Sequence, residues 1–213
     1  MGGFSECCSP HWVVNNFTRL EGDCKVNLIC PFVQHDNALT TGELDKHVFG
    51  QHLVHPVVTL SLRSHVSKRQ PSKALVLSFH GETGVGKNYV AQFIAESLYA
   101  KGLNSKYVHL FIATVDFPDD EKLDEYKLQL QDWIRGNVSQ CAQTLFIFDE
   151  VDKMPVGLLD AVKAFADYHK SISGVDFRRS IFIFLSNTGG RKISETALQF
   201  WKRGQKREEL KRK

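Results

Sequence analysis

The chain has 213 residues, a formal net charge of +3, 42% hydrophobic and 24% charged residues, an ordinary composition for one sizeable globular domain. It contains no apolar run of about 18 residues, so we expect no transmembrane segment. From Trp201 to Lys213 there are seven Lys or Arg and two Glu, a local charge of +5 that leaves −2 for the rest. That balance argues against a dedicated nucleic-acid-binding protein.

The sequence divides into three parts. Residues 1–43 show no clear period, and we expect an irregular N-terminal segment there. Residues 44–204 carry the periodic patterns of a folded core, and residues 205–213 form a basic tail. The core begins with a helical pattern from Leu44, followed by a polar, Pro-broken linker over 68–73. The first residues, Met1 to Cys8, have neither the basic nor the apolar stretch of a signal peptide.

Short apolar runs then alternate with helical patterns along the core. The four runs are Ala74–Phe79, Tyr107–Ala113, Thr144–Phe148 and Ser180–Leu185. Each is rich in Val, Ile, Phe or Leu and nearly continuous, which is typical of fully buried parallel strands. Amphipathic patterns between them predict crossover helices. The fold class is therefore α/β, a parallel sheet with helices on both faces, and ligands of such sheets bind beyond the carboxyl ends of the strands.

A phosphate-binding loop directly follows the first run. Its residues are Gly81, Glu82, Thr83, Gly84, Val85, Gly86, Lys87 and Asn88. The spacing is that of a P-loop, in which glycines let backbone N–H groups point at phosphate oxygens. The following helix adds its positive end, and Lys87 supplies a compact cation. Asn88 stands where Ser or Thr usually binds Mg²⁺; its amide oxygen is also a hard ligand.

Polar residues also end the last two runs. Asp149 and Glu150 follow Phe148, and we predict that Asp149 helps to hold Mg²⁺ while Glu150 is the general base for the attacking water. Asn187 follows the last run, where it could hydrogen-bond the γ-phosphate or that water. Taken alone, the two acids could cap a helix, and an Asn before glycines could form a turn.

The cysteines and the N-x-S/T triplets bear on whether the protein is secretory. Four of the five cysteines lie in the first 30 residues, without a zinc-binding spacing. Asn16 and Asn137 begin N-x-S/T triplets, which matter as glycosylation sites only in a secretory protein.

Together these motifs resemble the AAA+ superfamily and, within it, the torsins. The similar segments include the loop ending Gly86-Lys87-Asn88, the helix with Trp133-Ile134-Arg135-Gly136-Asn137, the run Ile147-Phe148-Asp149-Glu150 and the ending Leu185-Ser186-Asn187. Phe49-Gly50-Gln51 is similar to the torsin segment near the adenine, so the resemblance adds Gly50 and Gln51 to the expected nucleotide contacts. Glu82 stands where torsins usually have Trp.

The resemblance implies a function and a location. Torsins are ATPases of the endoplasmic reticulum lumen and nuclear envelope that act as chaperone-like remodellers of protein clients, using ATP and Mg²⁺. Membrane-anchored partners with AAA-like lumenal domains supply the arginine that they lack, and we expect a homo- or hetero-oligomer. Torsins continue with a fifth strand and a helical lid, which do not follow Leu210 here, so we expect an incomplete torsin core.

Three other functions fit parts of the sequence. Asn88 and the missing lid would suit a non-hydrolysing nucleotide switch or pseudo-ATPase. Val85 and the missing signal peptide would suit a cytosolic Clp-like unfoldase. A small-molecule kinase fits least, because no lid arginines follow the strands at useful positions.

Overall fold

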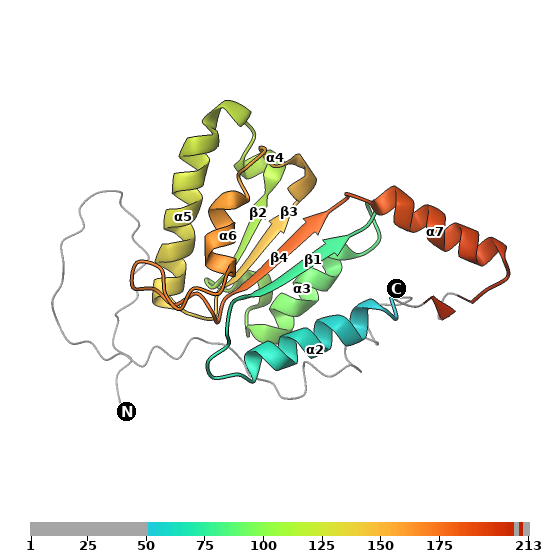
Figure 1. Cartoon of the computed structure of the whole chain (residues 1–213), viewed down its shortest axis with the longest axis horizontal. Coiled ribbons are helices and arrows are strands. Elements are labelled where there is room, and N and C mark those ends of the chain that lie inside the picture. The colour runs from blue at the N-terminus through green and yellow to red at the C-terminus, as the bar shows by residue number, and fades with distance from the viewer. Residues whose placement is uncertain (1–50, 207–208, 211–213) are drawn as a thin grey trace.

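The structure is a computed structural model that describes residues 51–206 and 209–210. In these residues a single sheet lies between helices (Figure 1). Its longer elements, in chain order, are α2 (Val54–Val66), β1 (Leu75–His80), α3 (Lys87–Leu98), β2 (Val108–Ile112), α5 (Leu123–Gln140), β3 (Leu145–Asp149), α6 (Asp160–Ala166), β4 (Ile181–Ser186) and α7 (Gly190–Lys202). Short turns of helix lie at α4 (Ala113–Asp116), η1 (Gly102–Asn104), η2 (Asp120–Lys122) and η3 (Val151–Lys153).

The four strands run parallel in the order β1-β4-β3-β2. Each predicted strand is confirmed, with bounds within one residue of the structure. The α/β class with a parallel sheet and crossover helices is confirmed as well. The order places β4, the last described strand, between β1 and β3, so the carboxyl ends of β1, β4 and β3 lie side by side at one edge of the sheet.

Alternation along the inner strands divides the core by side-chain type. Aliphatic residues of β3 and β4, such as Leu145 and Ile183, face α2 and α3 in one buried cluster. Phenylalanines at the intervening positions face α5 and α6 in another. In register these rings form rows across the sheet: Phe148 stacks on Phe111 at 5.1 Å and on Phe184 at 5.2 Å between centroids. Such pairs add stability beyond the area they bury.

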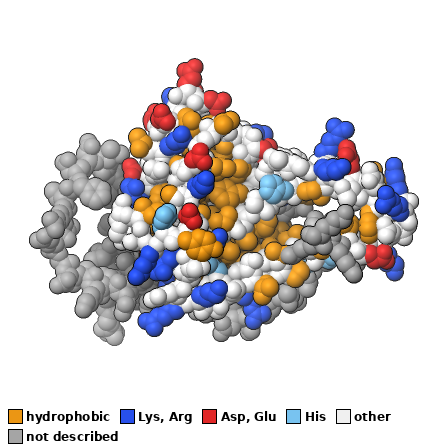
Figure 2. Space-filling model, in the orientation of Figure 1, with side chains coloured by type: hydrophobic (Ala, Val, Ile, Leu, Met, Phe, Trp, Pro, Cys, Tyr) orange, Lys and Arg blue, Asp and Glu red, His pale blue; other side chains and the backbone are white. Residues whose placement is uncertain are grey.

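The prediction of fully buried strands is wrong for β1. Val76 is 41% exposed, and Ser78 and His80 on the same face are exposed too. The reason is position, because β1 is an edge strand and, among the described residues, no helix covers this face beside β4. Leu110 in the other edge strand is also 48% exposed. Figure 2 shows hydrophobic side chains at the centre of this face, over the sheet.

Several expectations fall partly outside the described residues. The segment 1–43, Asn16, Gly50 and much of the basic tail lie there, so the three-part division stays a prediction. Beyond α7, the described residues form no helical lid. No described helix combines the length and apolar character that a bilayer crossing requires. Cys141, buried at the end of α5, is disulfide-bonded, and it is the sole cysteine of the described ranges.

His109 occupies one end of an aromatic row in the core. Its ring stacks on Phe146 at 5.4 Å and meets the edge of Trp133 at 5.7 Å. Burial lowers the pKa of His109 to about 4, although a hydrogen bond with Asn137 acts in the opposite direction. The imidazole is therefore neutral in the folded protein at neutral pH.

This lowered pKa predicts acid sensitivity. Between about pH 6.5 and 4 the unfolded chain binds a proton at His109 that the folded chain does not, so the free energy of unfolding falls as the pH falls through that window. For a partly exposed ring we expect a loss of about 2 kcal/mol. The measurement is urea unfolding of the parent and His109→Phe at pH 7.5 and pH 4.5. The variant should lose less stability than the parent; equal losses would contradict the assignment.

Candidate nucleotide-binding site

The predicted phosphate loop connects β1 to α3 with the backbone that such a loop requires. Gly84 and Gly86 have φ values of +82° and +96°, which side-chain-bearing residues rarely adopt. A Cβ on Gly81 would lie 2.8 Å from Cγ2 of Val85. Residues 82–85 are exposed, and α3 begins directly after Gly86. The unpaired N–H groups of the first turn and the positive helix end therefore face the loop.

The ammonium of Lys87 joins the loop to the end of β4. Its Nζ donates to the carbonyl oxygens of Gly81 at 2.8 Å and Glu82 at 2.9 Å, and to Oδ1 of Asn187 at 2.9 Å. The parallel register explains this meeting, because His80 pairs with Ser186 and the next residues on both strands enter the same loop region. Lys87 and Asn187 thus meet although they are 100 positions apart in the sequence.

Asn88 contacts the acidic end of β3. Its Nδ2 donates to Oδ2 of Asp149 at 2.6 Å, and the N–H of Glu150 donates to Oδ1 of the same carboxylate at 2.8 Å. A carboxylate can only accept hydrogen bonds, so the amide nitrogen of Asn88 must face it. That orientation leaves the amide oxygen as a possible metal ligand. Asn88 and Asp149 together offer the oxygen donors that suit Mg²⁺.

Glu150 is held by two partners that sequence reasoning did not identify. Its Oε2 accepts a hydrogen bond from Oγ1 of Thr114 at 2.7 Å, and Oε1 pairs with Nζ of Lys153. The Lys153 bond, then the Thr114 bond, lower the pKa of this carboxyl below its ordinary value. Glu150 also has a positive φ of 56°, an uncommon conformation for a residue with a side chain. The carboxylate is therefore ionised and oriented.

The position of Thr114 follows from the register of β2. Ile112 pairs with Asp149, so Thr114, two residues further along, lies beside Glu150. Thr114 belongs to the turn α4, in which Oδ2 of Asp116 accepts from the N–H of Ile112 at 2.6 Å. Thr114 follows the carboxyl end of β2, which is where parallel sheets place functional residues. This position is the signal in the sequence that points to Thr114.

Asn187 is also held in place through its backbone. Its N–H donates to Oδ1 of Asp152 at 2.8 Å, and Oγ of Ser186 donates to the same oxygen at 3.2 Å. Its own carbonyl accepts from the N–H of Gly190 at 2.9 Å, so it forms a turn as well as contacting Lys87. Asp152 thus links the end of β4 to the segment after β3, while its neighbour Val151 opens the short helix η3.

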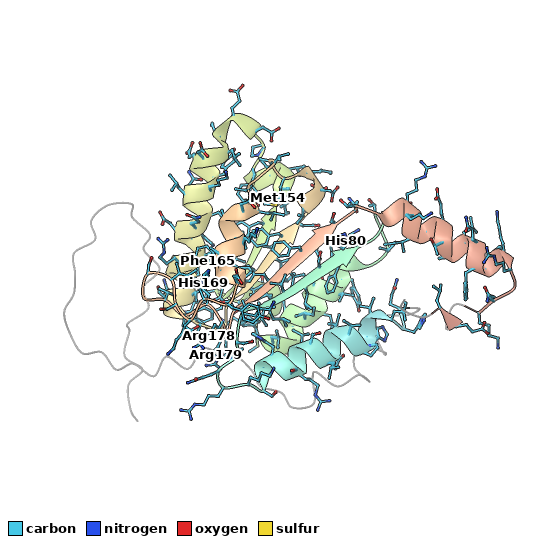
Figure 3. The ribbon with its side chains drawn as sticks, viewed as in Figure 1. His80, Met154, Phe165, His169, Arg178 and Arg179 are labelled. Atoms are coloured by element: carbon cyan, nitrogen blue, oxygen red, sulfur yellow. The ribbon has the colours of Figure 1, made fainter. Side chains whose placement is uncertain are left out.

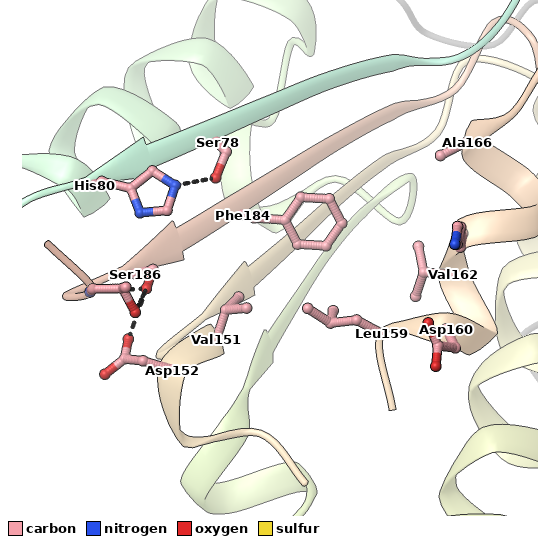
Figure 4. Close-up of a pocket in the computed structure, with 12 residues that line it drawn as sticks. Ser78, His80, Val151, Asp152, Leu159, Asp160, Val162, Ala166, Phe184 and Ser186 are labelled. Carbon is pink, nitrogen blue, oxygen red and sulfur yellow. Dashed lines mark hydrogen bonds between the residues drawn. The ribbon is translucent and has the colours of Figure 1, made fainter. Parts of the chain in front are cut away.

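Two pockets lie near these residues. One, of about 290 Å³, is lined by Gln51, His52 and Leu53 on one side and by α7 and Leu210 on the other. This pocket contains the predicted contact Gln51. The larger, about 480 Å³, lies against the uncovered face of β1 and β4, with Phe184 at its floor and His80 and Asp152 at its rim (Figure 4). No residue of 81–88 lines the larger pocket, so this pocket does not include the predicted phosphate loop.

Other polar side chains lie outside the group of contacts around Lys87 and Glu150. His80 marks the carboxyl end of β1, whereas Arg178 and Arg179 lie at the opposite end of the sheet (Figure 3). Asn137 is in α5, where its Nδ2 donates to the carbonyl of Trp133 at 2.8 Å. A glycan on Asn137 would replace that contact, and its attachment stays a prediction.

Gly190 is a further site residue that the motifs did not reveal. It begins α7, and a Cβ there would lie 2.6 Å from the backbone N of Glu82 and 2.7 Å from the carbonyl carbon of Gly81. These are backbone atoms, so no side chain can move aside. Only glycine lets the start of α7 approach the phosphate loop this closely.

We predict that Gly190→Ala disturbs the loop. Overpacking against backbone should lower the free energy of unfolding by about 2 kcal/mol. Chemical denaturation measures this change. The matched control is Gly136→Ala in α5, where an added Cβ meets nothing within 4 Å and a gain of about 0.5–1 kcal/mol is expected. If Gly190→Ala were as stable as the parent, the close approach would be wrong.

Comparisons with known proteins agree with this architecture. A family model described as Torsin matches residues 30–148. A Caenorhabditis elegans "Torsin-like protein" is 52% identical over 205 residues, covering 96% of this chain and 52% of that protein. The chain thus spans about half the length of this curated relative.

Among solved structures, the S. cerevisiae Hsp104-ADP complex matches with a TM-score of 0.55 and 21% identity, over 73% of this chain and 28% of that one. This likeness concerns the fold alone, which is that of a P-loop AAA+ domain. The family match and the close relative go further: the chain belongs to the torsin family.

Proposed function

We propose that this chain binds ATP with Mg²⁺ at the edge formed by β1, β4 and β3, and that it hydrolyses ATP as part of a torsin-like remodeller of proteins. The observation that carries the proposal is the pair of contacts Lys87–Asn187 and Asn88–Asp149. They bring the predicted phosphate loop next to the ends of β4 and β3, whose polar residues could contact a ligand bound at the loop. The torsin relative and the fold shared with an ADP-bound protein support the choice of an adenine nucleotide.

Each residue has a distinct part in the proposal. Backbone N–H groups of residues 81–88 and the start of α3 bind the phosphates, and the Lys87 ammonium moves to their oxygens. Asn88 and Asp149 would hold Mg²⁺, which when bound neutralises charge on the β and γ phosphates. Asn187 hydrogen-bonds the γ-phosphate or the attacking water.

Glu150 then serves as the general base. The water oxygen bonds to the γ-phosphorus, its proton passes to Glu150, and the bond from that phosphorus to the β–γ bridging oxygen breaks. The products are ADP and inorganic phosphate. Thr114 and Lys153 each occupy one lone pair of the carboxylate, so a second lone pair on either oxygen can accept this proton. We propose that a membrane-anchored partner, supplying an arginine in trans, is needed for rapid turnover.

We infer the location from the family. The proposal places the protein in the endoplasmic reticulum lumen and nuclear envelope, with Asn137 and Asn16 as glycosylation sites. A glycosidase-sensitive mass shift that becomes smaller in Asn137→Gln would support this location. Free thiols and no glycan would favour the cytosolic Clp-like alternative. The disulfide at Cys141 favours an oxidising compartment.

The hydrolysis proposal makes a direct prediction for Glu150→Gln. The amide cannot accept the proton, so phosphate release by the chain with its activating partner should fall at least about 100-fold. ATP should still bind, because the loop and Asp149 are unchanged, and the complex should stay ATP-bound. Phosphate release and retained nucleotide are measured together. Partner-stimulated release that is the same in Glu150→Gln as in the parent would defeat the proposed base.

A non-hydrolysing nucleotide switch is the second candidate function. The observation that favours it is that hydrogen bonds from Lys153 and Thr114 lower the pKa of Glu150, which makes its carboxylate a weaker base. A first discriminator is thermal stabilisation by Mg-ATP against Mg-ADP, since a switch should distinguish them without phosphate release.

If the two restraints on Glu150 are what prevents hydrolysis, their removal should permit it. We predict for the switch that the double variant Thr114→Val, Lys153→Met releases phosphate while the parent does not. Thr114→Ser with Lys153→Arg keeps both contacts and is the matched control. No release by the double variant, with ATP still bound, would show that the restraints are not the cause.

A further inference from the structure

The side chain and the backbone of Glu82 face different parts of the molecule. Its carbonyl accepts a hydrogen bond from Lys87 at 2.9 Å, as part of the phosphate loop. Its Oε2 instead accepts from Oγ of Ser194, in α7, at 3.0 Å. A carboxylate aimed at the phosphates would repel them. The contact with Ser194 gives this negative charge a partner on the helix.

Ser194 extends a contact that Gly190 begins. The two residues are four positions apart, so they lie on the same face of α7. Gly190 packs against the backbone of Gly81 and Glu82, and it is the one buried residue of this helix. Figure 1 shows α7 projecting away from the sheet beyond this point. The helix is thus attached at its first turns, where Glu82 supplies a side-chain hydrogen bond.

The neighbouring face of α7 lines the pocket that contains Gln51. Lys192, Ile193, Thr196 and Ala197 form its wall opposite His52 and Leu53. Ile193 is 51% exposed, so the wall is accessible from the pocket. The same helix therefore touches the phosphate loop through one face and borders a cavity of about 290 Å³ with the next.

We propose that Glu82 is a positioning residue for nucleotide binding. Through its hydrogen bond with Ser194 it holds α7 in place, so that this helix forms one side of the pocket that contains Gln51, and this pocket binds the base of the nucleotide. This inference rests on the proposed nucleotide-binding function. The phosphates would contact the loop itself, whereas the base would contact α7. Loss of the Glu82–Ser194 bond should therefore weaken binding of a nucleotide more than binding of its phosphates alone.

The first experiment tests the attachment without any ligand. Amide hydrogen exchange over 190–202 should be faster in Glu82→Ala and in Ser194→Ala than in the parent. Glu82→Gln keeps an acceptor oxygen and should restore the parent rate. Unchanged exchange in both alanine variants would overturn the proposal, as would equally fast exchange in Glu82→Gln.

The second experiment compares Mg-ATP with magnesium tripolyphosphate by calorimetry. ATP affinity should fall about fivefold in each alanine variant, the factor expected for one hydrogen bond, and tripolyphosphate affinity should stay within about twofold. The double variant Glu82→Ala, Ser194→Ala should lose no more ATP affinity than the more affected single variant, because both substitutions remove the same contact. An equal loss for both ligands, or additive losses, would overturn the proposal. A parent chain that binds neither ligand would instead contradict the proposed function, and exchange over 190–202 would still decide the attachment.

Discussion

The parallel pairing of β4 between β1 and β3 is the constraint on which the rest of the structure depends. It places the residue after His80 beside the residue after Ser186, and both beside the end of β3. Lys87 can then reach Asn187, and Asn88 can reach Asp149, although these residues are 100 and 61 positions apart. The aliphatic and aromatic layers that pack the two faces hold this order in place.

Glu150, at the polar edge of the sheet, is the most constrained residue of the candidate site. Glu150 adopts a positive φ, a conformation that costs about 1–3 kcal/mol and persists only where the surroundings impose it. Thr114 and Lys153 hold its carboxylate from two different elements. The same contacts that orient the carboxylate also lower its pKa and so weaken it as a base. The proposed hydrolase and the alternative switch therefore differ in how strongly these two contacts act on Glu150.

The phosphate loop is supported in a similar way from the side of α7. Gly190 permits the close approach, and Glu82 adds a hydrogen bond to Ser194. Because β1 is an edge strand with an exposed face, α7 is one of the few described elements near the start of the loop. The bond between Glu82 and Ser194 therefore links the loop directly to the helix in this chain.

The sequence by itself determined the strands of the sheet and the glycine-rich loop of the candidate site. Continuous apolar runs specified the strands, and the glycine spacing specified the phosphate loop, because both depend on local backbone and burial preferences. The sequence also placed Asp149, Glu150 and Asn187 at strand ends. Only the tertiary structure decided that Thr114 meets Glu150, that Gly190 packs on Glu82 and that β1 is exposed on one face. Those features depend on register and strand order, which bring together residues whose local patterns carry no sign of each other.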